Sequence, residues 1–474
     1  MVGVSLVDMP SLLAGMQRLE QELLLFSSFW FIVGALDELV VDGCWLWLRV
    51  KRGAGESRLP RGYELRPLNG RAAVVVAAWH EAEVIGAMVA HALKAWPHRE
   101  LTMFVGCYCN DPETLAAAMA GAGDDPRVRL VINGRPGPTT KADCLNRVYA
   151  ALCAEEVRRG VPFTSIIMHD AEDMVHPAAL AVIDRVLEEV HFVQLPVRPE
   201  PQRSSHWIAG HYSDEFTEAH AKSLVVRDGL GAAIPAAGVG CGFSRKALAE
   251  LAASRAAEGG DGPFSSECLT EDYELGLLVS SGGRNGRFLR LRDSHGDLVA
   301  TRAFFPARLD DAVRQKARWI HGIALQGWDR LGWSGRPVDI WMALRDRRGP
   351  LMAVVLAAAY GLLVIEALLA TARLLGWRET VAFSPLLRTM LAISFAAFVW
   401  RALWRFGWTA REYGVIEGLR AIVRIPIANI IAIMAGRRAL AAYFRTLRGS
   451  EVRWEKTRHS EHPAAAFASR SVAS

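Results

Sequence analysis

Two long apolar runs in the C-terminal third of the sequence restrict what this chain can fold into. Residues 351–372 form a run of 22 residues in which only Glu366 is charged. Residues 381–404 form another, which is interrupted by Arg388 and Arg401. A helix of about 20 apolar residues is long enough to cross the hydrocarbon core of a bilayer. The chain is therefore predicted to be a membrane protein.

The N-terminal region contains an apolar stretch that also carries acids. Residues 23–36 are uncharged, and Asp37, Glu38 and Asp42 separate them from the apolar residues 44–48. Because carboxylates are costly in lipid, we expect this helix to hide its acidic face against other helices. No basic segment precedes the run, so a signal peptide is not indicated.

A fourth apolar run, residues 425–436, has only 12 residues and is bracketed by arginines. It is too short to cross a bilayer, which favours an interfacial or re-entrant helix.

The distribution of basic residues predicts the orientation of these helices. Residues 49–71 carry seven Lys or Arg and two acids, which places this segment on the cytosolic side and the N-terminus outside. The predicted division is an N-terminal transmembrane helix at 1–50, a cytosolic domain at 51–310, amphipathic interfacial helices at 311–349, a transmembrane hairpin at 350–410, an interfacial or re-entrant helix at 411–449 and a disordered cytosolic tail at 450–474.

Charge and cysteine content argue against nucleic-acid binding and against a cysteine-based zinc site. The net charge is only +5, so nucleic acid is not an expected partner. The seven cysteines form no Cys-x-x-Cys pair and no zinc-ligand spacing, and we expect them to be reduced thiols.

The middle of the chain alternates between strand and helix patterns. β-rich runs lie at 72–79, 101–108, 128–132 and 164–168. Between them are helical patterns, among them residues 141–159, closed by Gly160, and a helix capped by Asp111 before Pro112. The alternation predicts an α/β fold with a doubly wound, mostly parallel sheet and a ligand at the carboxyl ends of its strands. No dinucleotide or Walker motif occurs there.

An acid cluster follows the fourth predicted strand directly. Asp170, Glu172 and Asp173 lie within four residues and repel one another unless a positive charge is near. A hard divalent cation, Mg²⁺ or Mn²⁺, bound by one or two carboxylates and by substrate phosphates would satisfy them. The alternative is an exposed acidic turn that caps the next helix.

Two further clusters are weak signals when each is taken alone. Thr270, Glu271 and Asp272 open a predicted helix, where acids commonly complement the helix dipole. Residues 315–319, with the sequence Gln-Lys-Ala-Arg-Trp, lie in an amphipathic stretch that is also typical of a basic interfacial helix.

The order and spacing of the three clusters resemble the processive, membrane-embedded family-2 glycosyltransferases, such as cellulose and hyaluronan synthases. The closer resemblance is to the bacterial inner-membrane glycosyltransferases called the phage-adsorption protein B family. It covers nearly the whole chain and rests on residues 78–83, 110–112, 140–146, 169–173 and 454–457. This resemblance implies a GT-A fold, a location in the bacterial inner membrane and a nucleotide-sugar donor, most often a UDP-sugar.

The resemblance also implies roles for residues on the donor side. Glu81 and Asp111 would bind the nucleoside, and Lys141 and Asp143, at a helix N-terminus, would lie near the phosphates. Gln315 and Arg318 would contact the diphosphate or the end of the acceptor.

Further residues would hold the metal and carry out the transfer. Asp170 would bind Mg²⁺ or Mn²⁺ together with Glu172 or Asp173. Asp272, beside Glu271, would be the general base of an inverting transfer. The residues expected to bind the acceptor are Trp319, Gly240 and Cys241.

The leading hypothesis is an enzyme that adds sugars to a growing polysaccharide and helps to export it, with help from a periplasmic or outer-membrane partner. The alternatives are a single transfer to a lipid carrier, and a receptor or scaffold component whose transferase site is vestigial. Members of the family often carry a cyclic-di-GMP-binding module after the membrane region. We expect this chain to lack that module.

Overall fold

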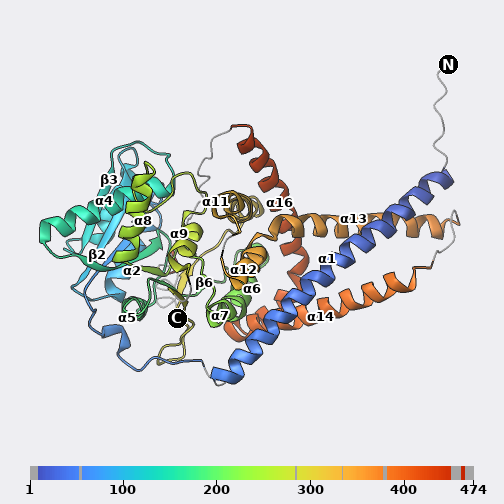
Figure 1. Cartoon of the computed structure of the whole chain (residues 1–474), viewed down its shortest axis with the longest axis horizontal. Helices are drawn as coiled ribbons and strands as arrows, with labels where there is room; N and C mark the ends of the chain where they lie inside the picture. Colours follow the sequence, from blue (N-terminus) through green and yellow to red (C-terminus); the bar gives the residue numbers. More distant parts are fainter. Residues whose placement is uncertain are drawn as a thin grey trace, which may run out of the picture.

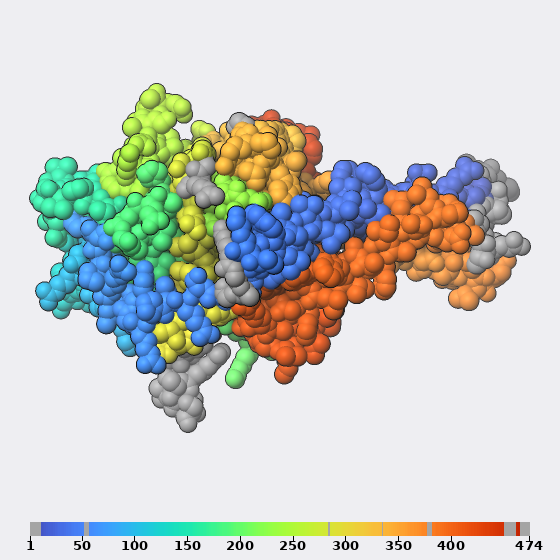
Figure 2. Space-filling view, turned by 60° about the horizontal axis from the view of Figure 1, so that its bottom comes forward, coloured from blue at the N-terminus to red at the C-terminus, as the bar shows by residue number. Residues whose placement is uncertain are grey.

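The computed structural model describes residues 9–52, 56–282, 285–333, 335–376, 382–449 and 461–464. Figure 1 shows a domain built on a β-sheet, from which long helices project to one side. Figure 2 shows that these helices form an elongated arm beside the bulkier domain. The predicted residues 454–457 and most of the predicted tail lie outside the described residues.

A seven-stranded sheet with the order β3-β2-β1-β4-β7-β5-β8 forms the centre of the domain. Its strands are β1 (Arg71–Ala77), β2 (Leu101–Tyr108), β3 (Val128–Asn133), β4 (Phe163–Asp170), β5 (Phe192–Gln194), β7 (Cys241–Ser244) and β8 (Gly286–Phe288). β7 runs antiparallel to both β4 and β5, and the remaining neighbours pair in parallel. The predicted α/β fold with a mostly parallel sheet is confirmed.

Helices cover both faces of the sheet because side chains of β1 alternate between two cores. Val74 and Val76 pack on one side, against α2 (Ile85–Ala95), α3 (Pro112–Ala122) and α5 (Ala179–Val186). Val75 and Ala77 pack on the other side, against α4 (Lys141–Arg159), α8 (Arg245–Ala257) and α9 (Glu271–Ser280). This period of two is what a strand buried on both faces requires.

Local capping signals set the helix ends as predicted. Asp111 caps α3 by accepting the backbone N–H of Thr114. Thr140 and Asp143 form a capping box at the start of α4, and Gly160 ends that helix in the left-handed conformation with φ 66°.

Two helical layers connect the sheet domain to the projecting helices. The first is α6 (Ile208–Glu218), a π-helical segment η2 (Ala219–Ser223) and α7 (Leu224–Gly229). The second is α10 (Leu309–Trp319), a π-helical segment η3 (Ile320–Gln326), α11 (Gly327–Leu331) and α12 (Pro337–Arg347). The short strand β6 (Val197–Pro199) precedes the first layer, and the short strand β9 (Thr301–Ala303) precedes the second. The two strands pair in parallel.

Within the described residues, four helices are long and apolar enough to cross a membrane: α1 (Met9–Arg52), α13 (Gly349–Leu374), α14 (Pro385–Tyr413) and α16 (Ile425–Leu447). A short helix, α15 (Val415–Val423), precedes α16. In Figure 1, α16 runs across the direction of α13 and α14 rather than along it.

The prediction that the fourth apolar segment is too short to cross a membrane is wrong, because the helix is longer than the apolar run. α16 has 23 residues, because the helix continues through Arg437 and Arg438, which are exposed to solvent. A helix does not need apolar residues on every face, so the end of an apolar run does not mark the end of the helix.

The prediction of a disordered tail also needs a correction at residues 461–464. This short segment packs against the sheet domain, and the side chain of His462 is 1% exposed.

The acids of α1 are hidden in an ion-pair network, as expected. The carboxylate of Glu38 accepts hydrogen bonds from Arg345, Arg348 and Arg401, at 2.9, 2.8 and 2.8 Å. The Lys222 ammonium of η2 lies 2.7 Å from the Asp42 carboxylate. We call Asp37, Glu38, Asp42, Glu218, Lys222, Arg345, Arg348 and Arg401 the joint network, since it ties α1, α12, α14 and the α6–η2 layer together.

We predict that Glu38→Gln destabilises the folded chain by about 3 kcal/mol. The joint network would then hold four cations against three carboxylates, which leaves one positive charge uncompensated. Thermal unfolding of the detergent-solubilised protein measures the effect. The control is Glu366→Gln, which removes a more exposed ion pair with Arg373 and should cost less than about 1 kcal/mol. Equal losses in the two variants would contradict a central role for the network.

Candidate active site

A cavity of about 380 Å³ lies where β1 and β4 end. Its walls come from the β4–α5 loop, the N-termini of α4 and α9, and the layers α6–η2 and α10–η3. Ten of the predicted site residues line it, namely Glu81, Lys141, Asp170, Glu172, Asp173, Glu271, Asp272, Gln315, Arg318 and Trp319. The site therefore lies at the carboxyl edge of the sheet, as expected.

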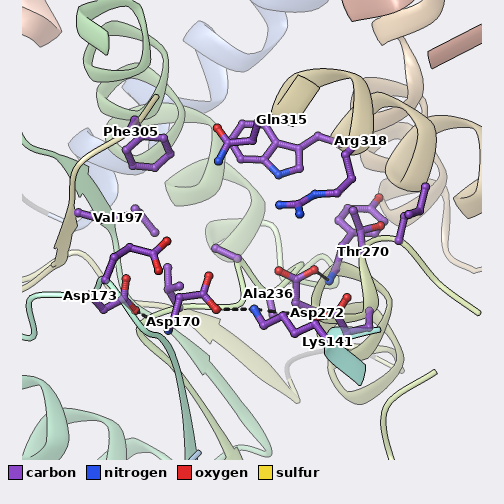
Figure 3. A pocket seen from close by; sticks show the side chains of 18 of the residues that line it. Lys141, Asp170, Asp173, Val197, Ala236, Thr270, Asp272, Phe305, Gln315 and Arg318 are labelled. Atoms are coloured by element: carbon purple, nitrogen blue, oxygen red, sulfur yellow. Dashed lines mark hydrogen bonds and ion pairs between the residues drawn. The ribbon is translucent and has the colours of Figure 1, made fainter. Parts of the chain in front are cut away.

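Lys141 neutralises part of the acidic floor of this cavity. Its ammonium lies 2.5 Å from Asp170 Oδ1 and 3.9 Å from Glu271 Oε1, and Figure 3 shows it pointing at Asp170. Burial alone would lower the pKa of Lys141, but the carboxylates of Asp170, Glu271 and Asp272 outweigh burial and raise the pKa above its ordinary value. Lys141 therefore carries a full positive charge on the cavity floor.

Glu271 and Asp272 form the first turn of α9. Burial, helped by the neighbouring Asp272, raises the pKa of Glu271 to about 7. Burial also raises the pKa of Asp272, and the Lys141 ammonium opposes that rise. The Asp272 carboxylate lies against the backbone at Gly238, whose φ is 75° and where any Cβ would overlap Asp272 Oδ2. A glycine is required there for both reasons.

The carboxylates of the acid cluster after β4 have different surroundings. Asp173 is 1% exposed, and its Oδ2 accepts hydrogen bonds from the His169 ring at 2.7 Å and from the Asp170 backbone N–H at 3.0 Å. Burial raises the pKa of Asp173, and the hydrogen bond with His169 opposes the rise. Asp173 thus braces the loop that presents Asp170 and Glu172 to the cavity.

The opposite wall is aromatic and amphipathic. Figure 3 shows Gln315 and Arg318 of α10 across the cavity from Asp170 and Lys141. Gln315 Oε1 is buried without a hydrogen-bond partner among the described residues. The Trp319 ring packs at 6.1 Å, between ring centres, from both Tyr212 and Phe216 of α6.

Four predicted residues lie behind the cavity rather than on its wall. Asp111 accepts the His80 backbone N–H at 2.6 Å as well as capping α3. Asp143 belongs to the capping box of α4. Gly240 abuts Thr301, and Cys241 is buried in β7, opposite Met168. These residues shape the walls through backbone and packing contacts.

No sequence motif points to the wall made by α6 and η2. Glu215, Phe216, Ala219 and His220 of this layer line the cavity, and Glu215 is paired with Lys316 of α10. Their spacing of four indicates one helix face. Nothing in that spacing indicates that the face meets a cavity.

A divalent metal ion fits this site only with ligands from a substrate. Asp170 and Glu172 offer hard carboxylate oxygens, which suit Mg²⁺ or Mn²⁺. Within the described residues, no group of three or more His, Cys, Asp or Glu could hold a metal ion. Phosphate oxygens and water would have to complete the coordination.

Comparison with known proteins defines the class. Residues 70–322, more than half of the chain, match the family described as glycosyltransferase like family 2. The chain belongs to this glycosyltransferase family, and the cavity lies within and beside the matched segment.

Two curated relatives are similar over most of this chain. They are bacteriophage adsorption protein B of Escherichia coli K12 and bacteriophage N4 adsorption protein B of Escherichia coli O157:H7. Each is 33% identical over 454 residues, which is 90% of this chain and 60% of the relative. The chain thus spans about three fifths of the length of these relatives.

Solved structures are more distant. The mannosyltransferase PcManGT from Pyrobaculum calidifontis, in complex with GDP-Man and Mn²⁺, is 18% identical with a TM-score of 0.47, over 84% of this chain and 99% of that chain. Glucosyl-3-phosphoglycerate synthase from Mycobacterium tuberculosis, in complex with Mn²⁺, UDP-glucose and phosphoglyceric acid, is 20% identical with a TM-score of 0.33, over 56% of this chain and 80% of that chain.

The raised pKa of Glu271 predicts a pH-dependent stability. The folded state keeps a proton on Glu271 up to about pH 7, whereas the unfolded chain releases it near the ordinary value of 4.5. The free energy of unfolding should therefore contain a component that falls as pH rises from about 4.5 to about 7 and is then constant. Glu271→Gln should remove this component, which amounts to about 3 kcal/mol. Denaturant unfolding of both proteins from pH 5 to 8 measures it, and parallel pH profiles would contradict the assignment.

Proposed function

We propose that this chain transfers a sugar from a nucleotide sugar, with a UDP-sugar as the expected donor, to a growing polysaccharide. The observation that carries the proposal is the arrangement of the cavity. An acidic floor with one lysine faces Gln315 and Arg318, and the carboxylate of Asp272 lies between the two walls. This arrangement suits a reaction that binds a diphosphate and removes a proton from a hydroxyl group.

The donor would lie along the ends of β1 and β4. Glu81 lines the cavity at the end of β1, where its carboxylate can accept hydrogen bonds from the nucleoside. Lys141 and Arg318 supply positive charge from opposite walls, which favours the diphosphate between them. In this proposal Asp111 and Asp143 act indirectly, because they hold the loop after β1 and the start of α4.

Asp170 and Glu172 are the residues that would hold the divalent ion. When bound, the ion would neutralise charge on the diphosphate and make the nucleoside diphosphate a better leaving group. Glu172 lines the cavity and is the proposed second ligand. The Asp173 carboxylate is instead assigned to holding the turn, since it accepts hydrogen bonds from His169 and from the Asp170 backbone.

Asp272 is the proposed general base. The oxygen of the acceptor hydroxyl forms a bond to the anomeric carbon while the bond from that carbon to the diphosphate oxygen breaks. The hydroxyl proton passes to the Asp272 carboxylate, and this single displacement inverts the anomeric centre. A pKa raised towards working pH makes Asp272 a stronger base than a solvent-exposed aspartate.

The aromatic wall favours a glycan acceptor over a phosphate-bearing lipid. Trp319 offers a ring for stacking against a sugar, and Gln315 Oε1 offers an unused acceptor for a hydroxyl group. The charge of Lys316, which neighbours this wall in α10, is paired with Glu215. Hydroxyl groups match this wall better than a second diphosphate does.

We also propose how the chain is placed in the inner membrane of a bacterium. α1, α13 and α14 span it with the N-terminus outside, the sheet domain lies in the cytosol, and α16 lies at the interface, in keeping with its transverse course in Figure 1. The three spans would line a path for the product, which a partner protein extends.

We predict that Asp272→Asn lowers kcat by about 10²–10⁴-fold, the usual contribution of a positioned base, with little change in the KM for the donor. Membranes that contain the full chain are given a panel of radiolabelled UDP-sugars with Mg²⁺ or Mn²⁺. The release of UDP and the length of the product are both measured. A wild-type product of many sugars is expected.

The matched control is Asp261→Asn, an exposed aspartate between α8 and α9, which should keep wild-type activity. Unchanged UDP release by Asp272→Asn would support a vestigial site. A product limited to one sugar on an organic-soluble lipid would support the lipid-carrier alternative.

A chelator should abolish UDP release, and Mn²⁺ or Mg²⁺ should restore it. Glu172→Gln should raise the half-saturating Mn²⁺ concentration by at least about 10-fold, the scale reported by changes around metal ligands. Titration of Mn²⁺ against initial rate measures this value. Full activity in the presence of the chelator, or an unchanged Mn²⁺ requirement in Glu172→Gln, would refute the assignment.

A further inference from the structure

A short C-terminal segment contacts the loop that presents the metal-binding carboxylates. Residues 461–464 lie far along the chain from this loop, yet His462 Nε2 is 3.0 Å from the backbone carbonyl oxygen of Asp173, across a sequence separation of 289 residues. His462 and Pro463 are both buried. The contact is therefore part of the domain interior rather than a surface encounter.

The hydrogen bonds of His462 fix its tautomer. Nδ1 accepts the backbone N–H of Ala464 at 3.1 Å, so the ring proton is on Nε2 and is donated to the Asp173 carbonyl. Burial lowers the pKa of His462 to about 4, and the neutral ring keeps this single donor direction near pH 7.

The backbone that follows the acid cluster is held by a series of such donors. The His91 ring lies 2.9 Å from the Val175 carbonyl oxygen, and Trp96 Nε1 donates to the His176 carbonyl at 3.1 Å. The backbone of Met174 pairs with that of Arg302 in both directions. These partners all come from residues 70–322, the segment matched to the family. The partner of the Asp173 carbonyl oxygen, His462, comes from outside this segment.

The position of Asp173 is transmitted to Asp170 through two hydrogen bonds. The Asp173 N–H donates to the Asp170 carbonyl at 3.3 Å, and the Asp170 N–H donates to Asp173 Oδ2 at 3.0 Å. The two residues thus form a closed turn. A shift of the Asp173 backbone displaces the base of the Asp170 side chain, whose carboxylate lies in the cavity.

We propose that His462 is a positioning residue for the transferase reaction, and that residues 461–464 form a strap that holds the Asp170–Asp173 turn in its metal-binding geometry. The part of this inference that concerns metal binding rests on the proposed function. Residues 461–464 are not among the residues that line the cavity, so the strap acts through the backbone and touches neither donor nor acceptor.

The test compares His462→Ala with His462→Gln in the full chain. Alanine removes the donor, and the glutamine amide can replace it. Two quantities are measured besides activity: hydrogen–deuterium exchange of the amides in residues 170–176, and binding of Mn²⁺ with UDP, followed by the loss of the free Mn²⁺ signal in electron paramagnetic resonance. The control is His295→Ala, a change at an exposed histidine.

In His462→Ala we expect exchange of residues 170–176 to rise about 10-fold and the Mn²⁺ concentration for half-saturation to rise about 10-fold. His462→Gln should recover most of both losses, and His295→Ala should match the wild type. Wild-type exchange and Mn²⁺ binding in His462→Ala would overturn the proposal, as would an equal rise of exchange throughout the domain.

These measurements separate the two proposals. If the wild type releases no UDP from any nucleotide sugar, the proposed function fails. Local protection of residues 170–176 that depends on residue 462 would then still support the strap. If the wild type is active and His462→Ala keeps both wild-type exchange and wild-type Mn²⁺ binding, only the strap fails.

Discussion

The carboxylate of Glu38 is the contact on which the arrangement of this molecule most depends. It lies in the C-terminal half of an apolar helix, where an isolated charge would be strongly disfavoured, and it is surrounded by cations from α12, η2 and α14. The arginines and the lysine compensate the charge of the acids, and the acids compensate theirs. Breaking one partner leaves an uncompensated charge, so the network has one arrangement of its helices that satisfies every member.

That arrangement also determines the shape of the cavity. The floor belongs to the sheet domain, but the opposite wall belongs to α6, η2 and α10. Lys222 of the joint network lies in the same π-helical segment as Ala219 and His220, which line the cavity. π-helical segments are rare and often occur at functional sites. The two segments here, η2 and η3, both contribute to the cavity wall, so the helical layers and the sheet domain build one site together.

The sequence predicts those features that local chemistry determines. The strands β1 to β4, the Asp111 cap and the start of α4 at Lys141 each follow from signals within a few residues. The different surroundings of Asp170, Glu172 and Asp173 do not follow from such signals, because they depend on which carboxylate contacts His169 in the interior. The α6–η2 wall and His462 were not predicted for a related reason. Their partners lie 100 residues or more away along the chain, and no local pattern records such a pairing.

The separation of Glu38 from its partners along the chain has a consequence for biosynthesis. Arg401 follows Glu38 by 363 residues, and a ribosome that adds about 5–20 residues per second reaches it roughly 20–70 s later. During that interval the first apolar helix has emerged, but Asp37 and Glu38 do not yet have their arginine partners. Its final packing must await the translation of α14, so α1 and α14 come together beside a sheet domain that has already had time to fold.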